Sequence, residues 1–268
     1  MLREVTLGQY YPVDSVIHRL DPRVKLLSTL LYMLSLFLVK SWSAYLFAVL
    51  LLAALIRLSK VPFRFMTKGL RGMLFLLLLS VSFNLFLTPG EVIWHFYFLK
   101  LTREGVRIAA MMASRLILLV LGSSLMTLTT TPNQLTDGLE KGLSILKLLH
   151  VPVHEIAMMM SIALRFIPIL VEETDKIMKA QMARGADFES GGMFQRAKAM
   201  VPILVPLFVS AFRRANELAT AMEARCYRGG EGRTKMKPLR YEKRDFLAYG
   251  FMLLYLLLCL GSRFLPLL

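Results

Sequence analysis

The feature that most constrains this chain is a series of long apolar blocks separated by short polar or basic breaks. Hydrophobic residues make up 56% of the sequence, and the mean hydropathy is +0.56. A soluble globular domain is about 45–50% apolar, and a membrane-spanning helix needs about 20 mainly apolar residues. We therefore predict an all-α, polytopic membrane protein with about five transmembrane helices, over residues 26–39, 42–56, 73–87, 106–128 and 246–260.

The first two blocks are each about 15 residues long, which is short for a span. One long tilted helix over 26–56 is therefore an alternative to two spans. A local polar break, Lys40-Ser41-Trp42-Ser43, favours two spans with a tight turn. Its tryptophan is a residue type that gathers at membrane interfaces.

The positive charges indicate the orientation in the membrane. The formal net charge is +15, and much of the surplus flanks apolar blocks instead of clustering with aromatics, which argues against a nucleic-acid binder. No cleavable signal peptide is expected. Cytoplasmic loops carry the excess of Lys and Arg, so we expect the N-terminus inside and the C-terminus outside. The inside segments then carry Arg3, Arg19, Arg23, Lys25, Arg57, Lys60, Arg64, Lys68 and Arg71, against Lys40, Lys100, Arg103 and Arg263 outside.

The chain changes character at Thr129, where acidic and basic residues begin to mix along helical patterns. We expect three parts: residues 1–128 with an N-terminal arm and four transmembrane helices, residues 129–245 with cytoplasmic helices, and residues 246–268 with the last transmembrane helix. Caps and apolar periodicity predict cytoplasmic helices over 132–149, 153–186 and 193–227. A basic, glycine-containing linker follows at 228–243.

The two long cytoplasmic patterns each show an apolar seam with alternating spacings of four and three residues. Such a rhythm predicts a helix that packs on another helix. The first seam is Ala163, Ile167, Leu170, Thr174, Ile177, Gln181 and Arg184, and the second is Leu204, Phe208, Ala211, Ala215, Leu218, Met222 and Arg225.

Both seams end in the same string, A-x-x-A-R followed by a small residue. The first is Ala183-Arg184-Gly185 and the second is Ala224-Arg225-Cys226. Ordinary helix C-termini would explain these strings, because a cation in the last turn and a glycine after it are both common. The repetition in one chain favours a second interpretation, in which an arginine at each helix tip binds a carboxylate of a partner through two parallel hydrogen bonds.

Other candidate residues are interpreted mainly as structural. Arg115 lies inside an apolar block and is a functional candidate, but a snorkelled or paired structural arginine is favoured. Asn84 is expected to bond between helices. His150 and His154 are separated by Pro152, and no metal site is predicted. The two cysteines, Cys226 and Cys259, form neither a zinc pattern nor a disulfide framework.

No catalytic arrangement is visible in the sequence. There is no Gly-x-x-x-x-Gly-Lys-Ser/Thr string for binding a nucleotide, and no nucleophile with a nearby base is suggested. We therefore expect no enzyme activity. Arg165-Phe166 and Glu172-Glu173 are interpreted as helix-surface contacts, with a partner role as the alternative.

Three segments carry a resemblance that covers nearly the whole chain: DSVIHRLDPRVKLL, LRFIPILVEETDKIMKAQMARGADF and VPLFVSAFRRANELATAMEARCYRGGEGRTK. They resemble the transmembrane T component of energy-coupling factor (ECF) transporters, the EcfT family, which is related to the cobalt-transporter CbiQ-type permeases. The resemblance implies a membrane scaffold whose coupling helices dock two ABC-type ATPases and hold a membrane-embedded S component that binds a vitamin or a metal ion.

The resemblance also assigns roles to residues. It implies that Ala183, Arg184 and Gly185, with Ala224, Arg225 and Cys226, dock in the two ATPases, although Cys226 stands where the family has glycine. ATP and Mg would be bound by those partners, and no cofactor by this chain. Candidates for the coupling-helix seam and for contact with the S component are Ala163, Ile167, Leu170, Leu204, Phe208, Ala211, Ala215 and Leu218.

Two alternatives remain from other classes. A stand-alone carrier would need several polar residues or broken helices at mid-membrane, and only Arg115 and Asn84 come close. A membrane enzyme or insertase would need grouped polar residues at the membrane surface. Neither the substrate nor the identity of the two ATPases follows from the sequence.

Overall fold

A computed structural model describes residues 10–38, 41–96, 99–188, 192–229 and 238–262. The predicted outside charges Lys40 and Arg263, and Arg3 on the inside, lie outside the described residues. The chain divides into two compact units, which are described separately. One comprises residues 8–142 and 239–268, and the other comprises residues 143–238 with 1–7.

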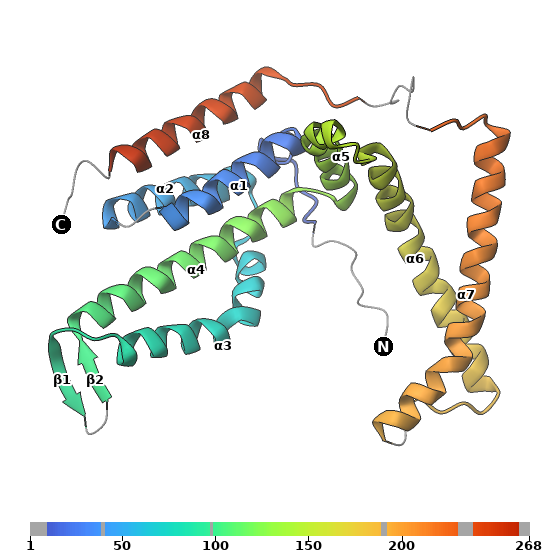
Figure 1. Cartoon of the computed structure of the whole chain (residues 1–268), viewed down its shortest axis with the longest axis horizontal. Coiled ribbons are helices and arrows are strands. Elements are labelled where there is room, and N and C mark those ends of the chain that lie inside the picture. Colours follow the sequence, from blue (N-terminus) through green and yellow to red (C-terminus); the bar gives the residue numbers. More distant parts are fainter. Residues whose placement is uncertain (1–9, 39–40, 97–98, 189–191, 230–237, 263–268) are drawn as a thin grey trace. The chain divides into compact units, whose positions relative to one another are not determined.

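The first unit is a helical bundle with one small hairpin (Figure 1). Its elements are α1 (Pro22–Leu38), α2 (Trp42–Ser59), α3 (Phe63–Leu87), β1 (Val92–Phe96), β2 (Leu99–Thr102), α4 (Arg103–Thr129), α5 (Pro132–Gly142) and α8 (Lys243–Gly261).

The polar break near residue 40 separates α1 from α2, which confirms two helices over 26–56. Ser41 is the N-cap of α2, with extended backbone angles. At the other end of α1, Asp21 is the cap and Pro22 the first helical residue. The Asp21 carboxylate accepts a hydrogen bond from Arg23 N at 2.9 Å, and an N-cap aspartate followed by proline is a common helix start.

The apolar core of the bundle lies between α1, α2, α4 and α8. Leu36, Ala44, Ala48 and Tyr255 are among its buried side chains. Small residues let the helix backbones approach closely. Gly122 of α4 is one of them, because a Cβ at this position would lie 2.8 Å from the Tyr32 ring of α1.

The segment between α3 and α4, which lies between two of the predicted spans, is a structured hairpin. Strands β1 and β2 pair antiparallel. The Thr102 hydroxyl then donates to Thr88 O at 2.9 Å and accepts from Gly105 N at 3.1 Å, so it ties the end of α3 to the start of α4. Helix α3 also begins ten residues earlier than the predicted span (Phe63 instead of Met73) and includes basic residues of the 57–71 segment.

A polar network joins the N-terminal arm to three helix ends. Tyr11 N donates to Leu128 O at 2.9 Å. Lys25 Nζ donates to His18 O at 3.0 Å and to Thr129 O at 2.8 Å. The buried Asp245 of α8 accepts a hydrogen bond from Asp21 N at 2.9 Å, which links the start of α8 to the start of α1.

The second unit contains a short 3-10 helix, η1 (Leu143–Leu149), followed by α6 (Val153–Ala183) and α7 (Met193–Ala224). The predicted helix over 132–149 is thus two elements, and α5 packs on α1 in the bundle. Pro168 lies inside α6, and Pro202 and Pro206 lie inside α7. Figure 1 shows α7 bending in its first part, as expected where proline removes a backbone donor.

Five described helices are long and apolar enough to cross a membrane: α2, α3, α4, α6 and α8. Four of them match predicted spans. Helix α1, with 17 described residues, is not among them. The apolar first part of α6 places this helix in the group, and its predicted cytoplasmic position stays a prediction.

Candidate functional site at the ends of α6 and α7

The C-terminus of α6 is closed by a Schellman motif. Gly185 has φ +88°, a left-handed conformation that glycine adopts without steric cost. Gly185 N donates to Met182 O and Ala186 N donates to Gln181 O, both at 3.0 Å. This pair of bonds satisfies carbonyls that a helix end otherwise leaves open, and it places Arg184 at the cap.

The C-terminus of α7 repeats the same motif with cysteine in the glycine position. Cys226 has φ +56°, and Cys226 N donates to Glu223 O at 2.8 Å. Tyr227 N donates to Met222 O at 3.0 Å, and Arg225 is the cap. The left-handed backbone is therefore kept at Cys226, although a side chain makes it less favourable than for glycine.

Both tips are open to solvent within their unit. All six predicted docking residues, Ala183, Arg184, Gly185, Ala224, Arg225 and Cys226, are exposed. Neither arginine is packed into the unit, so each guanidinium presents its planar set of donors outward. Such a group suits a carboxylate of another molecule, and ATPase docking stays a prediction.

Helices α6 and α7 cross one another, and their C-termini lie at different ends of the unit (Figure 1). Arg214 Nη2 of α7 lies 3.2 Å from Glu173 Oε2 of α6, with both side chains half-buried. Gln181 Nε2 of α6 also donates to Pro202 O of α7 at 3.3 Å. The two helices therefore share polar contacts as well as apolar packing.

The packing face of α7 begins one residue before the predicted seam. Ile203 and Ser210 are buried, whereas Leu204 and Phe208 are 47% and 61% exposed. Of the remaining seam candidates, Ala163 and Ala215 are exposed, and the half-buried ones are Ile167, Leu170, Ala211 and Leu218. The sequence analysis did not single out Ser210. It lies two helical turns after Ile203, so a helical period of 3.6 residues that starts at Ile203 would have placed it on the packed face.

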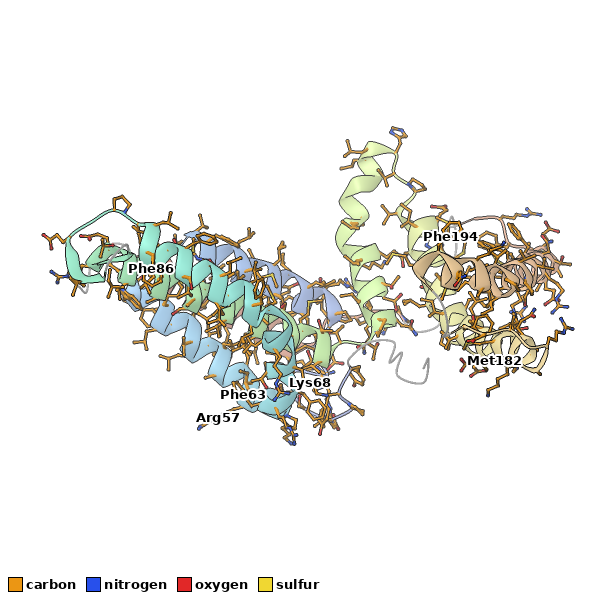
Figure 2. The ribbon with its side chains drawn as sticks, turned by 90° about the horizontal axis from the view of Figure 1, so that it is seen from below. Arg57, Phe63, Lys68, Phe86, Met182 and Phe194 are labelled. Carbon is orange, nitrogen blue, oxygen red and sulfur yellow. The ribbon has the colours of Figure 1, made fainter. Side chains whose placement is uncertain are left out.

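The exposed face of α7 is strongly apolar. We call it the α7 apolar stripe, and it consists of Val201, Leu204, Val205, Phe208, Val209 and Phe212, with exposures from 47% to 69%. Phe194 at the start of α7 and Met182 near the end of α6 are also exposed, at 86% and 50% (Figure 2). Contiguous exposed apolar surface of this kind marks an interaction with a protein or a membrane.

Arg115 and Asn84, the two polar candidates inside the predicted spans, have partners within the bundle. Arg115 Nε donates to the Tyr45 hydroxyl at 3.1 Å, and its guanidinium lies 5.7 Å from the centre of the Phe37 ring. This geometry fits the structural interpretation of Arg115. Asn84 Nδ2 donates to Ser80 O at 2.8 Å within its own helix. The expected bond to another helix is not the one formed, because the carbonyl one turn earlier is within reach.

Residues 14–236 match the CbiQ family, which is described as a cobalt transport protein. The chain belongs to this family. The matched region contains both capped tips and the first four predicted spans.

Relatives in this family match over almost their whole length. A protein from Clostridium kluyveri named energy-coupling factor transporter transmembrane protein EcfT is 54% identical over 265 residues, which is 98% of each chain. Proteins of the same name from Bacillus subtilis and Lactococcus lactis subsp. cremoris are 48% and 44% identical, and they cover 91% and 98% of this chain. The two alignments cover 93% and 99% of those relatives. The family confirms the resemblance of the sequence to EcfT.

Proposed function

We propose that this chain is the transmembrane coupling subunit of an ECF-type importer, which transmits ATP-driven movement from two docked ATPases to a membrane-embedded S component. The relatives' shared name supports the transporter assignment. The observation that carries the proposal is the pair of tips: two crossing helices end in the same hydrogen-bonded cap, each with an exposed arginine at the cap position.

Each tip would dock in one ATPase. Arg184 and Arg225 would each reach an acidic groove, where a charge-assisted pair of hydrogen bonds is stronger than a neutral one. ATP and Mg would be bound by the ATPases, and this chain would contribute no catalytic group. The cap at Cys226 differs chemically from that at Gly185, which is compatible with two different ATPase subunits.

The α7 apolar stripe would bind the S component. Val201, Phe208 and Phe212 form an apolar surface on the side of α7 that α6 does not cover. When the ATPases close on ATP, the docked tips would move together and shift this stripe. The S component would then experience a different surface in each nucleotide state, as any such coupling requires. The substrate, a vitamin or other micronutrient, would be selected by the S component.

Copurification with the ATPases tests the proposal. In a tagged chain carrying Arg184→Ala and Arg225→Ala, the recovery of both ATPases should fall by roughly tenfold or more, the effect of losing about 1.4 kcal/mol at each contact. The matched control removes two other exposed arginines of the same helices, Arg165→Ala and Arg213→Ala. Undiminished ATPase recovery with the tip variants, or equal loss in the control, would contradict docking through the tips.

A further inference from the structure

A cavity of about 400 Å³ lies inside the helical bundle. It is bounded by α1, α2, α4 and α8, together with Val16, Ile17 and Leu20 of the N-terminal arm. Its volume is within the range of small-molecule sites. Most of its surface is aliphatic, and it is partly open to the outside of the bundle.

The cavity occupies one half of the bundle. Its lining comes from the first half of α1 and of α8 and from the second half of α2 and of α4. The ends of α1, α2 and α8 in this half also carry basic residues, among them Arg23, Arg57 and Arg244. In Figure 2, Arg57 and Lys68 lie at this end of the bundle and Phe86 at the other. By the positive-inside rule this is the cytoplasmic end, so the cavity would lie at the level of the inner leaflet.

Two polar groups of the lining lack an acceptor among the described residues. The Tyr32 hydroxyl is buried and unbonded, and so is Arg244 Nε. Buried donors are normally satisfied. Arg244 Nη2 pairs with Glu242 at 2.9 Å, and the Glu242 side chain is 61% exposed. The Arg244 guanidinium therefore lines the cavity near solvent, and its Nε remains available as a donor.

We infer that the cavity binds an anionic phospholipid, with one acyl chain between α1, α2, α4 and α8 and the phosphate on Arg244. An aliphatic lining excludes a polar ligand, whereas an acyl chain matches it. The open donors match the phosphate and the ester oxygens near it, and a guanidinium binds phosphate through two parallel hydrogen bonds. Basic pockets between transmembrane helices on the cytoplasmic side bind anionic headgroups. The inference requires membrane insertion but not ATPase docking.

Bound lipid can be measured by native mass spectrometry of the full chain purified from membranes. Palmitoyl-oleoyl phosphatidylglycerol would compete against phosphatidylcholine with the same acyl chains, and inorganic phosphate would be tested alone. We expect one retained phospholipid, with phosphatidylglycerol preferred and phosphate alone not retained. Retention of phosphate without lipid, or no preference between the two headgroups, would overturn the inference.

Two pairs of variants locate the site. Ala248→Trp fills the cavity and should abolish retention, whereas Leu253→Trp on an exposed face of α8 should not. Arg244→Gln should reduce the preference for phosphatidylglycerol roughly tenfold, the loss of a charge-assisted contact. The control Lys243→Gln removes a neighbouring charge outside the cavity and should change it little.

The variant pairs also define the contradicting results. Lipid retained by a folded Ala248→Trp chain, or equal effects of Arg244→Gln and Lys243→Gln, would overturn the inference. If Ala248→Trp does not fold, the comparison of Arg244→Gln with Lys243→Gln decides the question. ATPase copurification should be unchanged in both pairs, so failure here is distinguishable from failure of the proposed function.

Discussion

Glu173 of α6 and Arg214 of α7 form an ion pair at 3.2 Å, and they occupy equivalent positions in their helices. Each lies eleven residues before the arginine that caps its own helix (173 to 184, and 214 to 225). The ion pair is therefore at the same distance from both tips. A movement of either tip acts on this ion pair through a helical arm of the same length, about 16 Å.

Breaking this ion pair should weaken the crossing. Glu173→Gln leaves a half-buried arginine without its carboxylate, and we expect a loss of about 1–2 kcal/mol in the free energy of unfolding. The exchanged pair, Glu173→Arg with Arg214→Glu, should recover part of this loss. Thermal unfolding of the purified chain would measure both effects in a double-mutant cycle. Strictly additive effects would show that the two side chains do not interact.

The two caps should respond oppositely to substitution. Cys226→Gly relieves a left-handed backbone and should stabilise the end of α7 by about 1 kcal/mol, whereas Gly185→Ala should destabilise the end of α6 by a similar amount. Cys226→Ala is the control, since it keeps the backbone cost. Hydrogen exchange of the last turn of each helix would report the changes. A destabilised cap in Cys226→Gly would contradict a strained cysteine position.

The two native cysteines allow a test of the predicted orientation. Cys226 is exposed and Cys259 is buried. In intact cells, a membrane-permeant maleimide should label Cys226 and an impermeant one should not, while Cys259 should resist both. The Cys226→Ala chain is the control for the labelled site. Labelling of Cys226 by the impermeant reagent would place the tip of α7 outside the cell and contradict the proposed function.

The N-terminal arm should loosen in acid. Burial, followed by repulsion from the Lys25 ammonium, holds the pKa of His18 below its ordinary value. The folded arm therefore favours neutral His18, and the unfolded arm binds a proton more readily. The contribution of His18 to stability is present above a pH of about 6.5 and is lost as the pH falls through the lowered pKa. Proteolysis of the arm should accelerate over this range, and His18→Gln should reduce the acceleration.

Gly122 should be far less tolerant of substitution than Gly250. A methyl group at Gly122 would lie 2.8 Å from the Tyr32 ring, whereas nothing lies within 4 Å of a methyl group at Gly250. We expect Gly122→Ala to cost about 1–3 kcal/mol through overpacking. Gly250→Ala should be neutral or stabilising by up to about 1 kcal/mol, because alanine favours a helix. Equal unfolding temperatures for the two variants would contradict the close packing of α1 on α4.

Local signals in the sequence were sufficient for most of the helices. The polar break before Trp42 is a signal carried by adjacent residues, and it was predicted correctly. The Asp21-Pro22 start of α1 is a local signal of the same kind. The two tips were also found, because the same string stands at the end of each helix. The sequence alone does not decide whether the backbone at Cys226 is left-handed. The steric cost of a cysteine in that conformation competes with the two hydrogen bonds that the cap forms.

Features that depend on distant contacts were not predictable in the same way. The seam of α7 was displaced by one residue because this helix is apolar on its exposed face as well as on its packed face. Periodicity cannot separate the two faces when a membrane or a partner covers one of them. The hairpin at β1 and β2 was missed for another reason: its segment is short, and its pairing depends on α3 and α4 holding its ends together.

The hydrogen bond from Asp21 N to the Asp245 carboxylate spans 224 positions in sequence. A ribosome delivers α1 to the membrane long before α8 exists, and until then the amide at the entrance of α1 lacks this acceptor. The bundle is thus completed only after its last helix has been made, when α8 supplies the acceptor for the start of α1. Truncated chains that stop before α8 should accordingly be recognised by membrane quality-control proteases, whereas the full chain should escape them.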